Sequence, residues 1–297
     1  MRKRITAILM AGLLVLAGCT NGPTTTTGAS GTGSDTTTAG GTTTAEATSG
    51  GDRDELVVGM EANYAPYNWA QPTDANGGVP IDGSTSFAGG YDVMVAKALA
   101  EHMERDLVIK QIAWEGLIPA VQNGSIDLII AGMSVTPERA ESVDFSDTYY
   151  DSKYVMLVKK GGQYESATSL ADFSGSRIIG QKSTNYDAVI PQIPEVQHET
   201  PLATVPLIIH AILSDVADGT VVEKPVAISV TAANPDLAMV EFSDENGFQE
   251  QEGIETELNI AMEKGNSELR DQVNEFLSGL TVEDRDSMMN EAVSNQP

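Results

Sequence analysis

The residue best placed to do chemistry is Arg139, which lies shortly after an apolar run, 126–131, that predicts a buried strand. Thr136 suits the N-cap of a helix and Pro137 suits its first position, so Arg139 falls in the first helical turn. Open α/β sheets bind ligands at the C-terminal edge of their strands, where free backbone N–H groups attract anions. A guanidinium at that edge can hold a carboxylate through two hydrogen bonds. The spacing predicts an anion site, and the alternative is a surface arginine paired with a neighbour such as Glu138.

Other chemistry-bearing residues form no comparable pattern. His102, His198 and His210 are scattered without partners at metal-ligand spacing, and the single cysteine excludes a Cys-based zinc site or a disulfide framework. The chain has neither the Gly-x-Ser-x-Gly turn of serine hydrolases nor a phosphate-binding P-loop. Tyr64 and Trp114 suit either a ligand site or the core. We therefore expect no metal, no cofactor and no catalytic residue.

The charge of the chain restricts its partners. The 297 residues include 43 acidic and 17 basic side chains, which give a formal net charge of −26. Nucleic-acid phosphates and anionic membrane surfaces repel such a body, so we expect it to bind neither. A hydrophobic fraction of 41% is enough for a substantial core.

The N-terminus has the pattern of an export signal. Basic residues within 1–4 precede an apolar run at 5–16, which is too short to span a bilayer and is typical of a signal peptide. The run ends in Leu16-Ala17-Gly18-Cys19, which resembles a bacterial lipobox. The resemblance implies a signal peptide of residues 1–18 and acylation of Cys19, and the alternative is an ordinary secretory signal.

Residues 19–53 consist mostly of Thr, Gly, Ser and Ala. Such a composition buries too little apolar surface to offset the entropy of ordering, so a disordered tether is expected. Starting from a lipidated cysteine, the tether would hold a globular body at the extracytoplasmic side of the cell membrane. We expect the lipid anchor to be its only contact with the membrane.

From Glu55 onward, short apolar runs alternate with amphipathic ones, which is typical of an α/β fold. The predicted strands are 56–60, 107–112, 126–131, 154–159, 177–180 and 220–222. The predicted helices are 91–104, 116–122 and 205–213, then one with an apolar face of Leu269, Val273, Phe276 and Leu280, and a last one capped by Thr281. These elements must position the site from the ends of the strands.

Several motifs resemble those of the polar amino acid solute-binding proteins of ABC importers. In order along the chain, they include Tyr64-Ala65-Pro66-Tyr67, Gly90-Tyr91-Asp92-Val93, Trp114-Glu115-Gly116-Leu117-Ile118-Pro119-Ala120, Gly132-Met133-Ser134-Val135-Thr136-Pro137-Glu138-Arg139, Val143-Asp144-Phe145-Ser146-Asp147 and Ala217-Asp218-Gly219. The resemblance implies a type II periplasmic-binding-protein fold, in which a two-stranded hinge joins two α/β lobes. Lobe 1 would comprise residues 54–152 and 258–297, and lobe 2 would comprise residues 153–257.

The resemblance also implies roles for individual residues. Arg139 would hold the α-carboxylate of an amino acid, with Gly132 and Ser134 beside it and Thr184 as a further donor. Glu223 would accept the α-ammonium group, in place of the shorter aspartate that is usual in the family.

The ligand side chain would lie between Tyr64 and Trp114, with Glu61 near its polar tip. Aromatic faces and a carboxylate suit a cation, so we expect arginine or lysine ahead of glutamine, with acidic amino acids last. Lys182 favours the opposite order, but a lysine can swing into solvent. Ser183, where many relatives have glycine, is a second departure from the family.

The segment 71–89 is longer and richer in Gly and Pro than the same region of short relatives. It would form either a lid or a surface loop, and we favour the loop.

The resemblance implies a function in import. We expect a monomeric, lipid-anchored protein that captures a polar amino acid and delivers it to an ABC permease. An enzyme is the first alternative, because the same fold resembles that of cyclohexadienyl dehydratases, in which site acids perform an elimination. Nothing here marks a general acid beyond Glu223. The second alternative is an amino-acid-sensing lipoprotein or adhesin at the cell surface.

Overall fold

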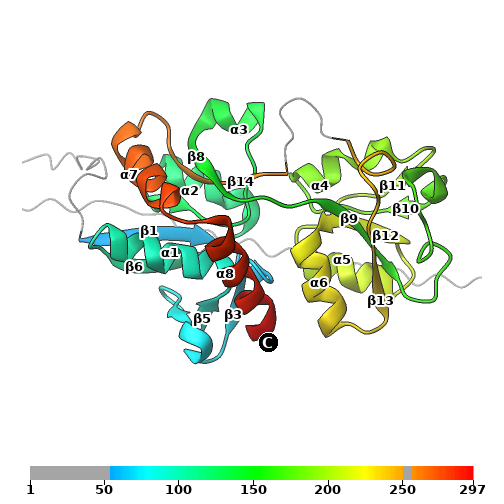
Figure 1. The fold of residues 1–297 in the computed structure, drawn as a ribbon, viewed down its shortest axis with the longest axis horizontal. Coiled ribbons are helices and arrows are strands. Elements are labelled where there is room, and N and C mark those ends of the chain that lie inside the picture. Colours follow the sequence, from blue (N-terminus) through cyan, green and yellow to red (C-terminus); the bar gives the residue numbers. More distant parts are fainter. Residues whose placement is uncertain (1–53, 250–255, 297) are drawn as a thin grey trace, which may run out of the picture. The chain divides into compact units, whose positions relative to one another are not determined.

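The structure is a computed structural model, and it describes residues 54–249 and 256–296. The predicted signal peptide 1–18, Cys19 and the tether 19–53 lie outside the described residues. In the two described ranges, no helix is both long enough and apolar enough to cross a membrane. These described residues form two five-stranded sheets, each with its own helices, and one four-stranded sheet (Figure 1).

The first five-stranded sheet is built around β1 (Glu55–Met60), which lies between β6 (Asp106–Gln111) and β7 (Leu128–Ile129). These three strands are parallel, so their C-terminal ends lie at one edge of the sheet. β14 (Leu258–Glu263) pairs antiparallel with β7 and with β8 (Val143–Tyr150), which completes the order β6-β1-β7-β14-β8. A late strand of the chain therefore lies inside a sheet made of early ones.

In the described part of the chain, five α-helices accompany the first sheet: α1 (Tyr91–His102), α2 (Leu117–Gln122), α3 (Pro137–Ser142), α7 (Ser267–Ser278) and α8 (Val282–Asn295). α1 packs against β6, α2 against β1, β7 and β14, and α7 against β8. The packing buries the apolar faces that the sequence periodicity predicts, such as Val95 and Leu99 on α1.

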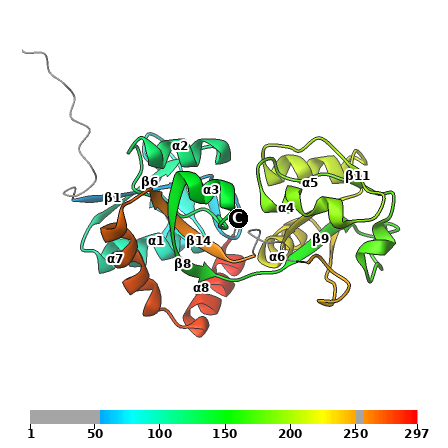
Figure 2. The same cartoon turned by 90° about the horizontal axis from the view of Figure 1, so that it is seen from above.

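The second five-stranded sheet has the order β11-β10-β12-β9-β13. Its strands are β9 (Tyr154–Lys159), β10 (Arg177–Ile178), β11 (Gln197–His198), β12 (Gly219–Glu223) and β13 (Leu237–Val240). β10 is parallel to β11 and β12, whereas β9 is antiparallel to β12 and β13. Its helices are α4 (Asn185–Ala188), α5 (Val205–Leu213) and α6 (Lys224–Ala233), which Figure 2 shows grouped with this sheet.

The chain passes from the first sheet to the second between β8 and β9, and it returns between β13 and β14 (Figure 1). This is the predicted α/β fold with two lobes joined by two segments. α8 packs against both α1 and α6, so the last helix adds a further contact between the lobes. The lobe boundaries at 152/153 and 257/258 stay predictions.

The segment 71–89 is more regular than the surface loop that we expected. Its strands belong to an antiparallel sheet whose order is β2 (Asn63–Tyr64), β3 (Asn68–Gln71), β5 (Phe87–Gly89) and β4 (Val79–Pro80). Ile81 forms a bridge with Ile109 on β6, and Nζ of Lys97 donates to the carbonyl of Gly77 (3.1 Å). The loop prediction was wrong for these strands, because strands of two to four residues are too short to show an alternating pattern.

Two local predictions need correction. The run 126–131 is buried throughout but forms only the two-residue strand Leu128–Ile129, because its backbone turns away toward Gly132 (φ 64°). Leu280 lies beyond the end of α7, whose buried face consists of Leu269, Val273 and Leu277. These three residues are spaced four apart and therefore share one face of the helix. Leu277, and not Leu280, is the last buried residue of that face. The other predicted elements begin and end within two residues of the predicted limits.

Candidate functional site

Arg139 lies at the start of α3, and the helix begins as predicted. The hydroxyl of Thr136 accepts a hydrogen bond from the backbone N–H of Arg139 (3.1 Å), and Pro137 is the first helical residue. Nη1 of Arg139 donates to the carbonyl of Ser134 (2.7 Å), and Nη2 donates to the carbonyl of Ser183 (3.0 Å). Burial lowers the pKa of the guanidinium, which stays charged at neutral pH. The guanidinium therefore connects the loop after β7 with the loop after β10.

The loop after β10 meets this guanidinium with its backbone. The carbonyl of Ser183 also accepts from Nε1 of Trp114 (3.1 Å), and the ring of Trp114 lies 5.2 Å from the guanidinium carbon of Arg139. Ser183 has a φ of 61°, a left-handed conformation that suits glycine. Thr184 caps α4, and its hydroxyl donates to the carbonyl of Gln181 (2.7 Å).

Glu223 is the last residue of β12 and directly precedes α6, so it lies at the C-terminal end of a strand of the second sheet. Its side chain is 1% exposed and accepts hydrogen bonds from the hydroxyls of Tyr64 and Tyr186. Burial raises the pKa of the Glu223 carboxyl well above its usual value. None of the ion pairs among the described residues includes Glu223. A cation at this carboxylate would therefore replace neutral donors by an opposite charge.

Glu61 directly follows β1 and is a second buried carboxylate, 5% exposed. Nε2 of Gln181 donates to Oε2 of Glu61 (3.2 Å) and to the carbonyl of Ala203 (3.1 Å). Burial raises the pKa of the Glu61 carboxyl, and the hydrogen bond from Gln181 opposes the rise. Sequence reasoning missed Gln181, which begins the same loop as Ser183.

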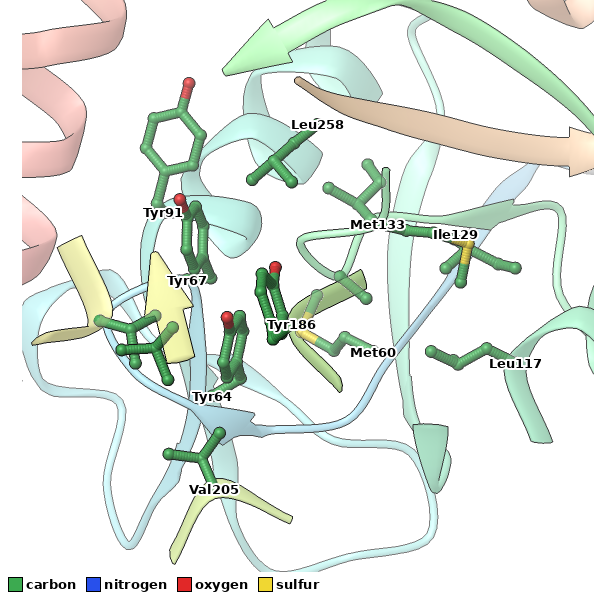
Figure 3. Close-up of a cluster of buried hydrophobic side chains, with 14 of the residues drawn as sticks. Met60, Tyr64, Tyr67, Tyr91, Leu117, Ile129, Met133, Tyr186, Val205 and Leu258 are labelled. Atoms are coloured by element: carbon green, nitrogen blue, oxygen red, sulfur yellow. The ribbon is translucent and has the colours of Figure 1, made fainter. Parts of the chain in front are cut away.

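Three tyrosine rings stack in the site (Figure 3). The ring of Tyr64 lies 5.5 Å from that of Tyr67, with 14° between their planes, and 6.4 Å from that of Tyr186, with 29°. Tyr64 is buried, whereas Trp114 is half-buried. Sequence reasoning also missed Tyr186, which could have been found from its place in the first turn of the helix that Thr184 caps.

Gly132 and Ser134 lie in the loop after β7. Gly132 has a φ of 64°, and a Cβ atom there would lie 3.2 Å from Cε1 of Tyr64. Both the backbone conformation and the limited space beside Tyr64 therefore favour glycine. Ser134 is buried and forms a backbone bridge with Leu258 of β14, which holds the loop against the first sheet.

The charge of Lys182 is paired at the surface. Its Nζ lies 2.9 Å from Oε1 of Glu115, and both side chains are more than half exposed. The hydroxyl of Ser183 donates to the same carboxylate (3.3 Å). This surface ion pair weakens the expectation that Lys182 brings a positive charge to the ligand.

The predicted ligand-binding residues all lie where the loops at the C-terminal ends of the strands meet: Glu61 and Tyr64 after β1, Trp114 after β6, Gly132, Ser134 and Arg139 after β7, Thr184 after β10, and Glu223 at the end of β12. Cys19 lies outside the described residues. The described residues contain no group of three or more His, Cys, Asp or Glu that could hold a metal ion.

Comparisons with known proteins identify the family. The sequence model of the bacterial extracellular solute-binding proteins, family 3, matches residues 56–287. The chain belongs to this family. The resemblance inferred from the motifs is thereby confirmed, and membership indicates a protein that works outside the cytoplasm.

Similar proteins support the same assignment. The arginine-binding extracellular protein ArtP of Bacillus subtilis is 27% identical over 76% of this chain and 77% of its own. The substrate-binding protein AbpA of Streptococcus pneumoniae, solved with L-arginine, has a TM-score of 0.68 at 26% identity, over 82% of this chain and 97% of its own. An ancestral arginine-binding protein, solved with glutamine, has a TM-score of 0.66 at 28% identity, over 83% and 100%.

Proposed function

We propose that the protein binds an α-amino acid with a cationic side chain and delivers it to an ABC permease. Arginine and lysine rank ahead of glutamine, and acidic amino acids come last. The observation that supports this proposal is the presence of two buried carboxylates, Glu61 and Glu223, to which the described residues supply hydrogen bonds but no ion pair.

The head group of the ligand has a partner for each charge. Arg139 takes the α-carboxylate, with Gly132, Ser134 and Thr184 beside it. Glu223 takes the α-ammonium group, which displaces the tyrosine hydroxyls from the carboxylate. Paired charges gain most when they are desolvated together, so the head group is bound best with both partners present.

The side chain of the ligand decides the ranking. It lies between Tyr64 and Trp114 with its tip at Glu61, where a guanidinium or ammonium group pairs with the carboxylate. Glutamine leaves the Glu61 charge unpaired, and glutamate places two carboxylates together. The cation of Lys182 opposes this order only weakly, because Glu115 neutralises it at the surface. The name of ArtP, an arginine-binding protein, favours a cationic ligand, and the relative solved with glutamine is consistent with glutamine as the next in rank.

Calorimetry with arginine, glutamine and glutamate tests the proposal. Arginine should bind most tightly and glutamate least. Glu61→Gln should lower the affinity for arginine by about 2–5 kcal/mol, or about 30-fold to several thousandfold, which is the usual loss when one member of a buried charge pair is removed. The affinity for glutamine should change by no more than about threefold.

The matched control is Glu115→Gln, which removes an exposed carboxylate of the same kind. Its ion pair with Lys182 is surface-exposed, so the variant should leave the affinity for arginine within about threefold. Equal losses for arginine and glutamine in Glu61→Gln, or tight binding of glutamate by the unchanged protein, would contradict the ranking.

The proposal includes export and anchoring. The lipobox-like Leu16-Ala17-Gly18-Cys19 supports cleavage after residue 18, acylation of Cys19 and attachment by a tether, residues 19–53, to the extracytoplasmic face of the cell membrane. Cys19→Ser should abolish incorporation of a labelled fatty acid and release the protein or leave an unprocessed precursor. A label that still enters the variant would contradict the anchor.

Delivery to a permease requires a binder that leaves its ligand unchanged. We propose a monomer whose two lobes, 54–152 with 258–297 and 153–257, close on the amino acid. Incubation with prephenate or arogenate tests the alternative of a dehydratase. Turnover of either compound would replace the binding function by an enzymatic one.

A further inference from the structure

Asp92 is a fully buried carboxylate outside the set of proposed ligand-binding residues. It lies in the first turn of α1 and is 0% exposed. Its two oxygens accept one hydrogen bond each: Oδ1 from the hydroxyl of Tyr149 (2.7 Å) and Oδ2 from Nδ2 of Asn68 (2.7 Å). None of the ion pairs in the described ranges includes Asp92. Its place is therefore defined by hydrogen bonds.

Each partner of Asp92 also binds a backbone N–H group. The hydroxyl oxygen of Tyr149 accepts from the N–H of Gly132 (2.9 Å), and Oδ1 of Asn68 accepts from the N–H of Ala62 (2.7 Å). The five residues form a continuous buried chain of hydrogen bonds, which we call the Asp92 network. It runs from the loop after β1 to the loop after β7.

Both ends of the network have unusual backbone conformations. Ala62 has a φ of 56° and Gly132 has a φ of 64°. A left-handed conformation is unfavourable for alanine and persists only where surrounding contacts hold it. Ala62 directly follows Glu61, and Gly132 lies two residues before Ser134. The network therefore ends beside two of the three segments of the proposed site that belong to the first sheet, those after β1 and β7.

The direction of the hydrogen bonds requires an acceptor at the centre. Both ends are backbone donors, so each bond in the two arms points inward: the N–H of Ala62 to Asn68 and Asn68 to Asp92, and the N–H of Gly132 to Tyr149 and Tyr149 to Asp92. An ionised carboxylate accepts from both arms, whereas an amide in its place must turn its NH₂ group toward one of them. The central position therefore suits aspartate and not asparagine.

We infer that Asp92 is a positioning residue, which fixes the segment of Glu61 relative to the segment of Gly132 and Arg139 by accepting from both arms of the network. The role of these segments in binding rests on the proposed function, whereas the coupling between them does not. Burial raises the pKa of Asp92 to about 6, and the hydrogen bonds from Tyr149 and Asn68 oppose the rise. The carboxylate is thus mainly ionised at neutral pH, as the network requires.

The first test is Asp92→Asn, which turns an amide NH₂ group toward one arm. Hydrogen exchange at the N–H group of the disturbed arm, Ala62 or Gly132, followed by NMR, should become at least about tenfold faster, since a buried hydrogen bond is lost. The dissociation constant for L-arginine should rise at least about tenfold at a temperature where circular dichroism shows the variant fully folded. A role in global stability alone would lower the Tm and leave this constant unchanged.

The second test moves the acceptor along the network. In the double variant Asn68→Asp with Asp92→Asn, the carboxylate introduced at position 68 accepts from Ala62 and from the amide introduced at position 92. That amide keeps its oxygen for the hydroxyl of Tyr149. Every bond of the network again has a donor and an acceptor, so amide exchange and arginine affinity should return to within about threefold of the unchanged protein.

Two single variants make the test independent of whether Asp92→Asn folds. Tyr149→Phe interrupts one arm, so it should speed exchange at Gly132 and not at Ala62. Tyr91→Phe is the matched control: it removes the bond from the hydroxyl of Tyr91 to the carbonyl of Tyr149 (2.8 Å), which lies outside the network. The control should lower the Tm while both amides and the arginine affinity keep their values.

The outcomes separate the two proposals. If the unchanged protein does not bind L-arginine, the proposed ligand class fails, and amide exchange alone decides the role of Asp92. If Tyr149→Phe and a folded Asp92→Asn leave exchange at both amides and arginine affinity unchanged, the positioning role is overturned. It is likewise overturned if the double variant is no better than Asp92→Asn.

Discussion

Binding of arginine should release protons, because the two carboxyl groups proposed to receive its cationic groups have raised pKa values in the folded protein. Burial raises the pKa of Glu61 above its usual 4.5 and that of Glu223 well above it. A guanidinium or ammonium group beside a carboxylate favours the charged form and lowers that pKa again. Each group therefore gives up a proton on binding when the pH lies between its two pKa values.

The pH dependence of the affinity for arginine follows from the number of carboxyl groups that release a proton on binding. Each proton released changes the affinity by up to about tenfold per pH unit, so Glu61 and Glu223 together allow up to about 100-fold. The affinity for arginine should rise with pH above about 4.5 and level off once the pH exceeds both raised pKa values. Glutamine carries only the ammonium group, so it should release only the proton of Glu223.

The same raised pKa values make the stability of the fold depend on pH. A carboxyl group whose pKa is higher in the folded than in the unfolded protein binds more protons when folded. The free energy of unfolding without ligand therefore falls as the pH rises from the unfolded pKa through the folded one. Arginine should offset this fall, because it pairs with the ionised groups.

Titration calorimetry in buffers of different ionisation enthalpy measures the protons released. At a pH above the usual 4.5 of the two carboxyl groups, the observed enthalpy of arginine binding should depend on the buffer, and the dependence should fade once the pH exceeds both raised pKa values. Glu61→Gln should release fewer protons with arginine and the same number with glutamine. A buffer-independent enthalpy across this range, or a release that Glu61→Gln leaves unchanged, would refute the reasoning.

Three substitutions test other parts of the structure. Arg139→Ala should weaken arginine binding by about 2–5 kcal/mol in calorimetry while the protein stays folded, and an unchanged affinity would remove Arg139 from the site. Gly132→Ala should lower both stability and affinity, by about 1 kcal/mol or more in stability, because of the φ of 64° and the contact with Tyr64; unchanged denaturant unfolding would contradict this. Thr281→Ala breaks the capping box with Asp284, so the free energy of unfolding should fall by about 1 kcal/mol with arginine affinity unchanged.

The features that the sequence predicted best depend on close neighbours along the chain. The N-cap at Thr136 with Pro137 after it is a pattern of adjacent residues, and the structure has the helix and Arg139 where the pattern predicts them. The N-cap at Thr281 is of the same kind. The family could be inferred as well, because its motifs are short runs that keep their order along the chain.

Other predictions were wrong or incomplete because the sequence carries no local pattern for the structure that forms. The strands of segment 71–89 are short, so their pairing gave no periodic signal and we expected a loop. The buried run 126–131 predicted a longer strand than the one that forms, because burial comes from packing and does not require that each residue pair in a sheet. Lys182 has an exposed partner, Glu115, that lies 67 positions away.

The sequence by itself determined many of the elements, the helix caps at Thr136 and Thr281, and the helical turn that holds Arg139, because hydrogen bonds and periodicity within a few residues specify them. Only the tertiary structure decided which side chains meet. Tyr64 lies 159 positions from Glu223, and Gln181 lies 120 positions from Glu61, yet each pair is hydrogen-bonded. Contacts of this range depend on how two sheets pack and on where their strands end, and no local pattern encodes that geometry.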